Sequence, residues 1–483
     1  MTKHNPNRRT FYVYAIIFGL LATAQGFSNR GYYLDDAFIF LRVGRNLAEN
    51  ASFAFNVGSR INCSTSFLNP LFAALAHIMP GNPILIMHIV NDAFFGGAAI
   101  VLLHLFAEKN NVLAGFICGL AILADPLIHM TYGMETGLTI LLSLAALAFM
   151  EKDDRFCGLL MGLAILARPD TVLFVLIILS YMAVTRRSFP IKAVLFFLIP
   201  VLPWLVFSIV YWGSPFPQTL SAKMAQGASG FWKDEIMFLP GLITQLDDFY
   251  PFPWNMVMAL FVALGAWKLY RERSVLILVF LWAILHVIAY CFLGVPGYHW
   301  YYALVFLVLD ISIGGAAWLV YDLFLKVVNS RYENKGRRAQ ILAAILCIVV
   351  LAPAANTVRK STGLDLPPRE RAYKEMGLWI KENTEKHETI AAIEIGTVGY
   401  YSERPVVDPL GMVADSDMAE SMKEAYKGGW VEKLKPDIII IHRKIWPIEM
   451  ALVNSEVQRN YEPMKLFEFP RYRNMVVLRR TRQ

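Results

Sequence analysis

The chain has 483 residues, of which 56% are hydrophobic and only 17% charged, and its formal net charge is +7. Soluble domains carry about a quarter charged residues, so this composition excludes an ordinary soluble protein. The positive charge does not indicate a nucleic-acid partner, because most Lys and Arg residues lie in short loops between apolar blocks. The five Cys residues form no CxxC pair, which indicates neither a disulfide framework nor a zinc site.

The apolar blocks predict about eleven transmembrane helices, because each is near the length that crosses a bilayer. They lie at residues 11–28, 84–107, 111–125, 136–150, 156–167, 171–185, 191–212, 251–268, 274–293, 299–325 and 340–356. Residues 66–79 are also apolar but short, and we expect an interfacial helix there on the outer side. No A-x-A cleavage site follows the first block, which favours an uncleaved first helix over a signal peptide.

The distribution of Lys and Arg predicts the orientation in the membrane. The turns 126–135 and 294–298 contain neither residue, whereas the alternate loops are basic. Because basic loops stay in the cytoplasm, we expect a multi-pass protein of the bacterial inner membrane with a cytoplasmic N-terminus and an outer C-terminus. The expected inner loops contain Lys109, Lys152 and Arg155, Arg186 and Arg187, Lys268 with Arg271 and Arg273, and residues 326–338.

Two domains are expected. Residues 1–356 form a transmembrane module with long outer loops at 29–83 and 213–250. Residues 357–483 are more polar and form a small α/β domain outside the membrane, with a helix near Glu370–Lys386. Its strands are expected at Thr389–Ile395, Asp437–Ile441 and Asn474–Arg479, and the four consecutive Ile residues of the second indicate a buried strand. The fold class is an α-helical polytopic membrane protein with this appended domain.

The pair Asp35 and Asp36 follows the first predicted helix and precedes Arg42, Arg45 and Asn46 at helical spacing. One interpretation is a solvated first turn of a helix, where Asp favours the helix dipole. A second is a general base at the membrane boundary, with the neighbouring carboxylate raising its pKa. A third is a site for a divalent cation.

The stretch from Leu34 to Leu71, LDDAFIFLRVGRNLAENASFAFNVGSRINCSTSFLNPL, resembles the first outer loop of polytopic glycosyltransferases of the C superfamily (GT-C). It is most similar to the mycobacterial terminal arabinofuranosyltransferases and their bacterial relatives. Where the family reads Thr-Asn-Pro-Leu-Trp, this chain has Ser66–Phe72, SFLNPLF, a departure that bears on the sugar more than on the reaction. Further matching stretches follow in order: Gly133–Thr136, Ala167–Asp170, Gly213–Lys223, Tyr298–Tyr302 and Gly396–Gly411.

The resemblance implies a sugar donor carried on a polyprenyl phosphate, with Asp35 or Asp36 as the general base. A phosphate leaving group needs cations near its oxygens, and the outer face offers Arg168, Lys223 and His299. Each has a structural alternative. Arg168 could pair with the nearby Asp170, Lys223 could extend along the membrane surface, and His299 lies in an aromatic cluster typical of a membrane interface.

Four further residues are candidates for contacting the acceptor or orienting the catalytic carboxylates: Arg42, Asn46, Glu135 and Tyr298. Glu135 has the alternative of a helix N-terminal acid. Tyr298 has that of the interfacial aromatic belt. No residue is assigned to a metal, although the paired carboxylates are compatible with a divalent cation, and no other cofactor is expected.

The sequence therefore predicts a membrane glycosyltransferase that moves a sugar, with arabinofuranose favoured, from a polyprenyl-phosphate donor to an outer acceptor. The acceptor is either a cell-surface glycan or a secreted or pilus protein. The alternative is a flippase or transporter of lipid-linked sugars, a class that often shows two related halves. A membrane-anchored sensor ranks last, since eleven helices exceed what an anchor needs.

Overall fold

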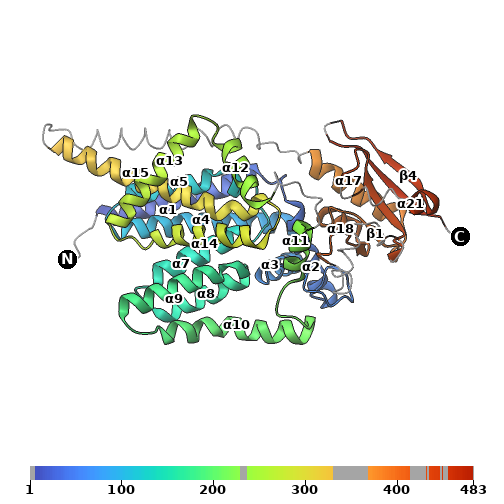
Figure 1. Ribbon diagram of the computed structural model, residues 1–483, viewed down its shortest axis with the longest axis horizontal. Coiled ribbons are helices and arrows are strands. Elements are labelled where there is room, and N and C mark those ends of the chain that lie inside the picture. The colour runs from blue at the N-terminus through green and yellow to red at the C-terminus, as the bar shows by residue number, and fades with distance from the viewer. Residues whose placement is uncertain are drawn as a thin grey trace.

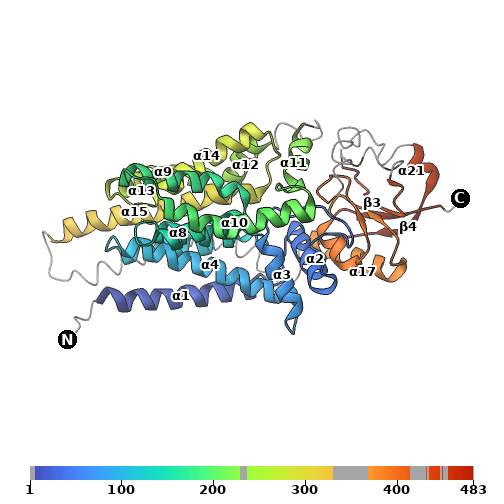
Figure 2. The ribbon, with the colours of Figure 1, turned by 90° about the horizontal axis from the view of Figure 1, so that it is seen from below.

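The computed structural model describes residues 6–228, 237–329, 368–413, 431, 434–446, 449, 455–470 and 472–481. The helices run roughly along the long axis of the molecule and form a bundle (Figures 1 and 2). The C-terminal domain lies at one end of this bundle, and the N-terminal end of the chain lies at the other. Helices α2, α3 and α11 lie between the bundle and the domain in both views.

Each of the first ten predicted apolar segments is a helix, whereas the eleventh, 340–356, lies outside the described residues. These helices are α1 (Pro6–Ser28), α4 (Pro83–Ala107), α5 (Val112–Ala124), α7 (Thr136–Phe149), α8 (Asp154–Ala167), α9 (Val172–Arg186), α10 (Ile191–Trp212), α13 (Trp254–Arg271), α14 (Ile277–Leu293) and α15 (Ala303–Asn329). The loops predicted to lie on the outer side add α2 (Asp35–Asn50), α3 (Leu68–Ile78), α11 (Gln218–Ala228) and α12 (Phe238–Phe249). Short turns of helix lie at α6 (Pro126–His129), η1 (Pro169–Thr171) and η3 (His299–Tyr302).

Length separates the membrane helices into two groups. Within the described residues, five spans are long and apolar enough to cross a membrane: Arg8–Ser28, Pro83–Ala107, Pro169–Arg186, Ile191–Trp212 and His299–Lys326. The pair α12 and α13, bent by 107°, would make a sixth. Helices such as α5 are apolar but shorter. At 1.5 Å per residue they do not cover a core of about 30 Å alone. The chain is a multi-pass membrane protein, and the number of about eleven crossings stays a prediction.

Helix α15 is the central helix of the bundle, since it packs on α5 on one side and on α13 on the other, and most of its residues are buried. The contact with α13 is close because Gly265 lies directly on the backbone of Ser312 and Gly315. A side chain at Gly265 would collide with that backbone. Small residues permit such approaches between membrane helices, where packing replaces the hydrophobic effect.

The C-terminal domain is the expected small α/β unit. Its helices are α17 (Pro368–Asn383), α18 (Gly396–Ser402) and α21 (Ser455–Asn460). Its strands are β1 (Ile390–Ala391), β2 (Val406–Val407), β3 (Ile438–His442), β4 (Tyr461–Phe467) and β5 (Met475–Arg480). The sheet order is β2-β1-β3-β5-β4, in which β1 is parallel to β2 and β3 and the remaining pairs are antiparallel.

The predicted strands agree with this sheet in part. The Ile run is the fully buried strand β3, as expected, with Ile438 opposite Arg479 and His442 opposite Met475. The strand predicted at Thr389–Ile395 is only two residues long, because the chain turns into α18 after it. Strand β4 was not predicted, since its exposed edge position is marked by Pro463 and charged residues rather than by apolar alternation.

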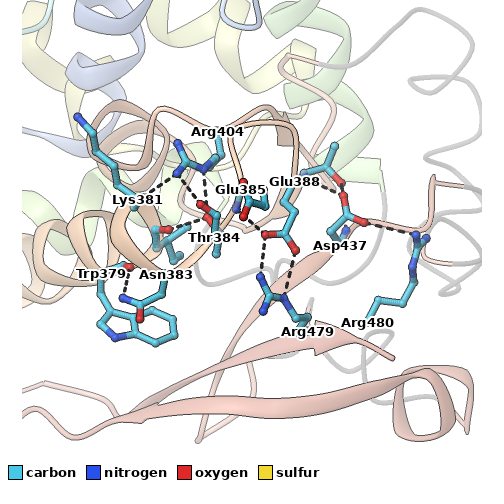
Figure 3. Close-up of polar contacts among 12 residues, drawn as sticks. Trp379, Lys381, Asn383, Thr384, Glu385, Glu388, Arg404, Asp437, Arg479 and Arg480 are labelled. Atoms are coloured by element: carbon cyan, nitrogen blue, oxygen red, sulfur yellow. Dashed lines mark hydrogen bonds and ion pairs between the residues drawn. The ribbon is translucent and has the colours of Figure 1, made fainter. Parts of the chain in front are cut away.

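Polar contacts connect α17 to the sheet (Figure 3). The Arg404 guanidinium donates to the carbonyls of Lys381 at 2.7 Å and Thr384 at 2.8 Å, which caps the end of α17. Arg479 of β5 pairs with Glu388 at 2.7 Å, just before β1. These contacts join the end of α17 to the segment before β2, and β5 to the segment before β1.

Replacing Ile438 by Ala is expected to destabilise the C-terminal domain by about 2–5 kcal/mol, because the side chain is fully buried in the middle of the sheet. Hydrogen exchange of the β3 and β5 amides in the full chain measures this loss. Leu378→Ala is the control, since Leu378 is 40% exposed on α17. Equal protection in the two variants would contradict the described core.

Candidate functional site

A cavity of about 380 Å³, called the outer cavity here, lies where the loop helices α2 and α11 meet the membrane helices α9 and α14. Its polar lining consists of Asp36, Glu135, Arg168, Asp170, Lys223 and Tyr290, together with Thr65 and Thr219. Its apolar lining includes Ile39, Phe40, Val172, Leu173, Phe216, Leu220, Leu293, Trp300 and Tyr301. The cavity therefore combines titratable groups with a large apolar wall.

Asp36 places its carboxyl group at this cavity from the first turn of α2. Burial raises its pKa above the usual 3.8, the ammonium of Lys223 opposes that rise, and the carboxylate of Asp35 adds to it. A carboxylate with a raised pKa is a better proton acceptor than an ordinary one. Asp36 is thus a candidate general base.

Asp35 has a different environment, although it is the adjacent residue. Its two carboxylate oxygens accept the backbone N–H groups of Gly396 at 3.0 Å and Thr397 at 2.8 Å, at the start of α18. The residue is only 4% exposed and does not line the outer cavity. Neighbouring residues of a helix point about 100° apart, so the helix directs one carboxylate to the cavity and the other to the C-terminal domain.

Arg168 lies among acidic and aromatic groups on the cavity wall. Its Nε donates to both oxygens of Asp170 at 3.0 Å, and its Nη1 lies 3.6 Å from Oε1 of Glu135. Tyr290 of α14 donates its hydroxyl to Asp170 at 2.7 Å and accepts from Arg168 at 3.3 Å. The predicted ion pair with Asp170 exists, and the same guanidinium lines the cavity.

Glu135 is buried beside this guanidinium. Burial raises the pKa of its carboxyl group, and Arg168 opposes the rise. The carboxylates of Glu135 and Asp170 both contact the Arg168 guanidinium. These contacts hold the Arg168 side chain in one position. Arg168 and Glu135, predicted from separate outer turns, are therefore brought together.

Lys223 enters the cavity from α11 and is only 7% exposed. Its Nζ lies 3.7 Å from the ring centre of Tyr298 and 5.7 Å from that of Trp300, a cation–π arrangement. The Tyr298 hydroxyl donates to Gln226 at 3.0 Å, which orients the ring under the ammonium. Among the carboxylates that the structure describes, none is within ion-pair distance of Lys223, so its charge is directed at the cavity.

His299 is not among the residues that line the outer cavity. Its Nε2 lies 3.3 Å from the carbonyl of Met130, and its ring packs edge-on against Trp300. Its role at a phosphate stays a prediction that this position does not support.

Arg42 and Asn46 connect backbone segments instead of facing the cavity. Arg42 donates to the carbonyl of Phe55 at 2.7 Å and to that of Arg404 at 2.7 Å, and also to the Gly399 carbonyl. Asn46 donates to the carbonyls of Ala54 and Phe55, each at 2.9 Å. Both side chains are buried and shape the first outer loop. A contact with the acceptor stays an untested prediction for both.

Sequence reasoning missed Tyr290, which completes the Arg168 cluster. A signal existed, because His286 and Tyr290 are polar residues four apart on one face of an otherwise apolar helix. His286 Nδ1 lies 3.8 Å from Asp170, so both residues of that face reach the same carboxylate. Cys63, a free and buried thiol on the cavity wall, was also not assigned.

The described residues contain no group of three or more His, Cys, Asp and Glu side chains placed to hold a metal ion. The two oxygens of Asp35 accept backbone N–H groups of the C-terminal domain, so Asp35 and Asp36 do not converge on a common point. The pair as found does not form the divalent-cation site that the sequence allowed.

Comparisons with known proteins concern the fold. The crystal structure of ArnT from Cupriavidus metallidurans bound to undecaprenyl phosphate matches with a TM-score of 0.60 and 14% identity, over 96% of this chain and 97% of that chain. ArnT in the apo state matches with a TM-score of 0.60 and 14% identity, over 97% and 98%. The arabinofuranosyltransferase AftD from mycobacteria matches with a TM-score of only 0.48 and 13% identity, over 99% of this chain and 40% of that chain.

Sequence comparison adds one match. Residues 359–481 fit the family model described as a domain of unknown function, DUF8728, which covers the C-terminal domain. No curated protein sequence matches the chain. The structural likeness to ArnT over nearly the whole length of both chains shows that this protein has the fold of ArnT.

Proposed function

We propose that the protein is a membrane glycosyltransferase that transfers a sugar from a polyprenyl-phosphate donor to an acceptor outside the cytoplasm. The observation that carries this proposal is the outer cavity, in which charged groups and an apolar wall face the same space. A ligand that fits such a space has a charged head and a long apolar tail.

The apolar wall suits the lipid part of the donor. Val172 of α9, Leu293 of α14, and Phe216 and Leu220 of the α11 segment form this side of the cavity. Phe216 is 70% exposed, although it is a large apolar side chain. Exposed apolar side chains beside membrane helices are favourable where lipid covers them. The polyprenyl chain would lie along this wall.

The charged end suits the phosphate. Lys223 and Arg168 both line the cavity, and Lys223 has no carboxylate partner among the described residues. A cation in a partly dry cavity stabilises phosphate oxygens more strongly than one in water. Lys223 is therefore assigned the primary contact with the phosphate, and Arg168 a contact oriented by Asp170 and Glu135.

Asp36 is assigned the role of general base. As Asp36 accepts the proton of the acceptor hydroxyl, the hydroxyl oxygen attacks the anomeric carbon of the donor sugar. The bond between that carbon and the phosphate oxygen breaks, and its electron pair remains on the phosphate. Lys223 and Arg168 stabilise the charge that develops there.

The fold supports this assignment, since ArnT has been crystallised with undecaprenyl phosphate and its fold matches this chain. Arabinofuranose as the sugar rests on the sequence resemblance of the first outer loop. A cell-surface glycan or a secreted or pilus protein as acceptor rests on the outer placement predicted for the cavity. The bacterial inner membrane, with the C-terminal domain outside, is likewise proposed from the distribution of basic loops.

The Asp36→Asn variant is expected to lose donor turnover by about 10²–10⁴-fold, because an amide cannot accept the hydroxyl proton. Purified protein is incubated with a panel of polyprenyl-phosphate sugars, beginning with arabinofuranose, and donor loss is followed by mass spectrometry. Asp247→Asn, on the exposed side of α12, is the matched control and should keep wild-type turnover. Wild-type protein that consumes no donor, even with membrane extract as acceptor, would favour the flippase alternative.

The pH dependence tests the same residue. Transfer requires Asp36 as a carboxylate, and its pKa is raised above 3.8 by burial. The rate is therefore expected to fall on acidification at a pH above the ordinary range of an Asp carboxyl group. The profile of kcat/KM measures the midpoint. A rate that stays constant down to the ordinary range of Asp would exclude Asp36 as the base.

The Lys223→Met variant is expected to lower kcat/KM for the donor by roughly 10–100-fold, the usual loss for a charged hydrogen bond. Met keeps the length of the side chain and its packing on Tyr298 but removes the charge. Lys374→Met is the control, because Lys374 also lies over an aromatic ring, that of Tyr401 at 5.3 Å, but does not line the cavity. Equal losses in both variants would refute a specific phosphate contact.

A further inference from the structure

Asp35 and Asp36 are adjacent in the chain but face different parts of the molecule. We propose that Asp35 is a positioning residue, whose carboxylate docks the C-terminal domain onto α2 so that the domain forms the acceptor side of the site. The role in catalysis rests on the glycosyltransferase function proposed above, whereas the docking itself does not.

The first argument is that both oxygens of the Asp35 carboxylate already accept hydrogen bonds. One oxygen accepts the N–H of Gly396 and the other accepts that of Thr397. A general base must come within about 2.6–3.2 Å of the proton donor that it serves. Asp35 is 4% exposed and directed at α18, so it offers no oxygen to a substrate in the outer cavity.

The second argument is the shape of the contact between α18 and α2, which lie side by side (Figure 1). A Cβ at Gly396 would collide with the backbone carbonyl of Asp35, and one at Gly399 would lie 2.8 Å from the ring of Phe55. Only glycine permits this approach at Gly396. The two helices are thus fitted to each other through backbone atoms.

The third argument is that further polar contacts connect α2 and the loop after it to the C-terminal domain. Arg45 donates to the carbonyl of Tyr400 at 3.0 Å and pairs with Glu403 at 3.3 Å. Asn56 donates to the carbonyl of Val406 at 2.8 Å and accepts its N–H at 2.9 Å. This reciprocal pair fixes the outer loop to strand β2 in one register. The domain is therefore docked in a defined orientation.

The docking brings a charged pair of the C-terminal domain close to the site. Glu394 precedes Gly396 by two residues and forms an ion pair with Arg369 of α17 at 2.6 Å. Burial raises the pKa of Glu394 to about 7, Arg369 opposes this, and Asp35 and Asp36 add to it. Glu394 and Arg369 thus lie within electrostatic reach of Asp36. A paired guanidinium and carboxyl group suit the hydroxyls of a neutral sugar, because both donors and acceptors are present.

The test compares the two sides of one contact. Asp35→Asn removes the charge from α2, and Gly396→Ala blocks the approach of α18. Both variants are expected to increase hydrogen exchange of the amides at 396–399 about tenfold or more. Both should raise KM for the acceptor about tenfold. The pH midpoint of kcat should stay unchanged in Gly396→Ala, whereas in Asp35→Asn it should shift to lower pH, because the Asp35 carboxylate adds to the raised pKa of Asp36.

Two controls separate docking from chemistry. Asp36→Asn should abolish kcat and leave exchange at 396–399 unchanged. Gly19→Ala should change neither, because no atom lies within 4 Å of a Cβ added at Gly19 of α1.

The proposal is overturned if exchange at 396–399 is unchanged in Asp35→Asn. It is also overturned if this variant abolishes kcat as Asp36→Asn does, which would make Asp35 the base. Wild-type protein that turns over no donor would refute the transferase function, whereas the exchange measurement would still decide the docking.

Discussion

The hydrogen bonds of the buried Arg42 guanidinium hold the loop at residues 29–83 to the C-terminal domain, and the rest of this end of the molecule depends on them. The guanidinium donates to the carbonyls of Phe55, Gly399 and Arg404 and to the side chain of Asn56. The side chain is only 5% exposed, and this burial lowers its pKa to about 9. A buried cation is tolerated only when its donors are satisfied. The first outer loop and the C-terminal domain must therefore adopt their positions together.

The outer cavity forms where this loop and the α11 segment meet the membrane helices. The ordered loop supplies Asp36 and Ile39 from α2, and the α11 segment supplies Lys223. The turn η1 supplies Asp170 and α14 supplies Tyr290, and the hydrogen bond between them connects η1 to α14. Charges at the membrane boundary are thus paired, placed over an aromatic ring or directed at the cavity.

The fold was largely predictable from the sequence, because apolar blocks mark the helices of a membrane bundle. The number of about eleven crossings stays a prediction, since α5 has only 13 residues and α12 and α13 are bent by 107°. In the C-terminal domain the Ile run of β3 was evident from its composition. Strand β1 lies within the strand predicted at Thr389–Ile395 but is shorter, because the chain turns into α18 after it.

Part of the site was also predictable, because the distribution of charge along the sequence places its residues. The distribution of basic loops assigned Asp36, Glu135, Arg168 and Lys223 to the same side of the membrane, and these residues now line one cavity. The different surroundings of Asp35 and Asp36 were not predictable, because Asp35 accepts hydrogen bonds from Gly396 and Thr397, far along the chain. The same holds for Arg42, whose partners lie in the loop and in the domain.

The apolar wall formed by Val172, Phe216, Leu220 and Leu293 determines in which units the affinity for a lipid ligand must be expressed. A lipid ligand that reaches this wall from within the bilayer is diluted by lipid, not by water. Its occupancy is then governed by its mole fraction among the surrounding lipids. The same protein and lipid ligand would give different apparent constants in large and small detergent micelles, and a constant defined per area of bilayer would agree between preparations.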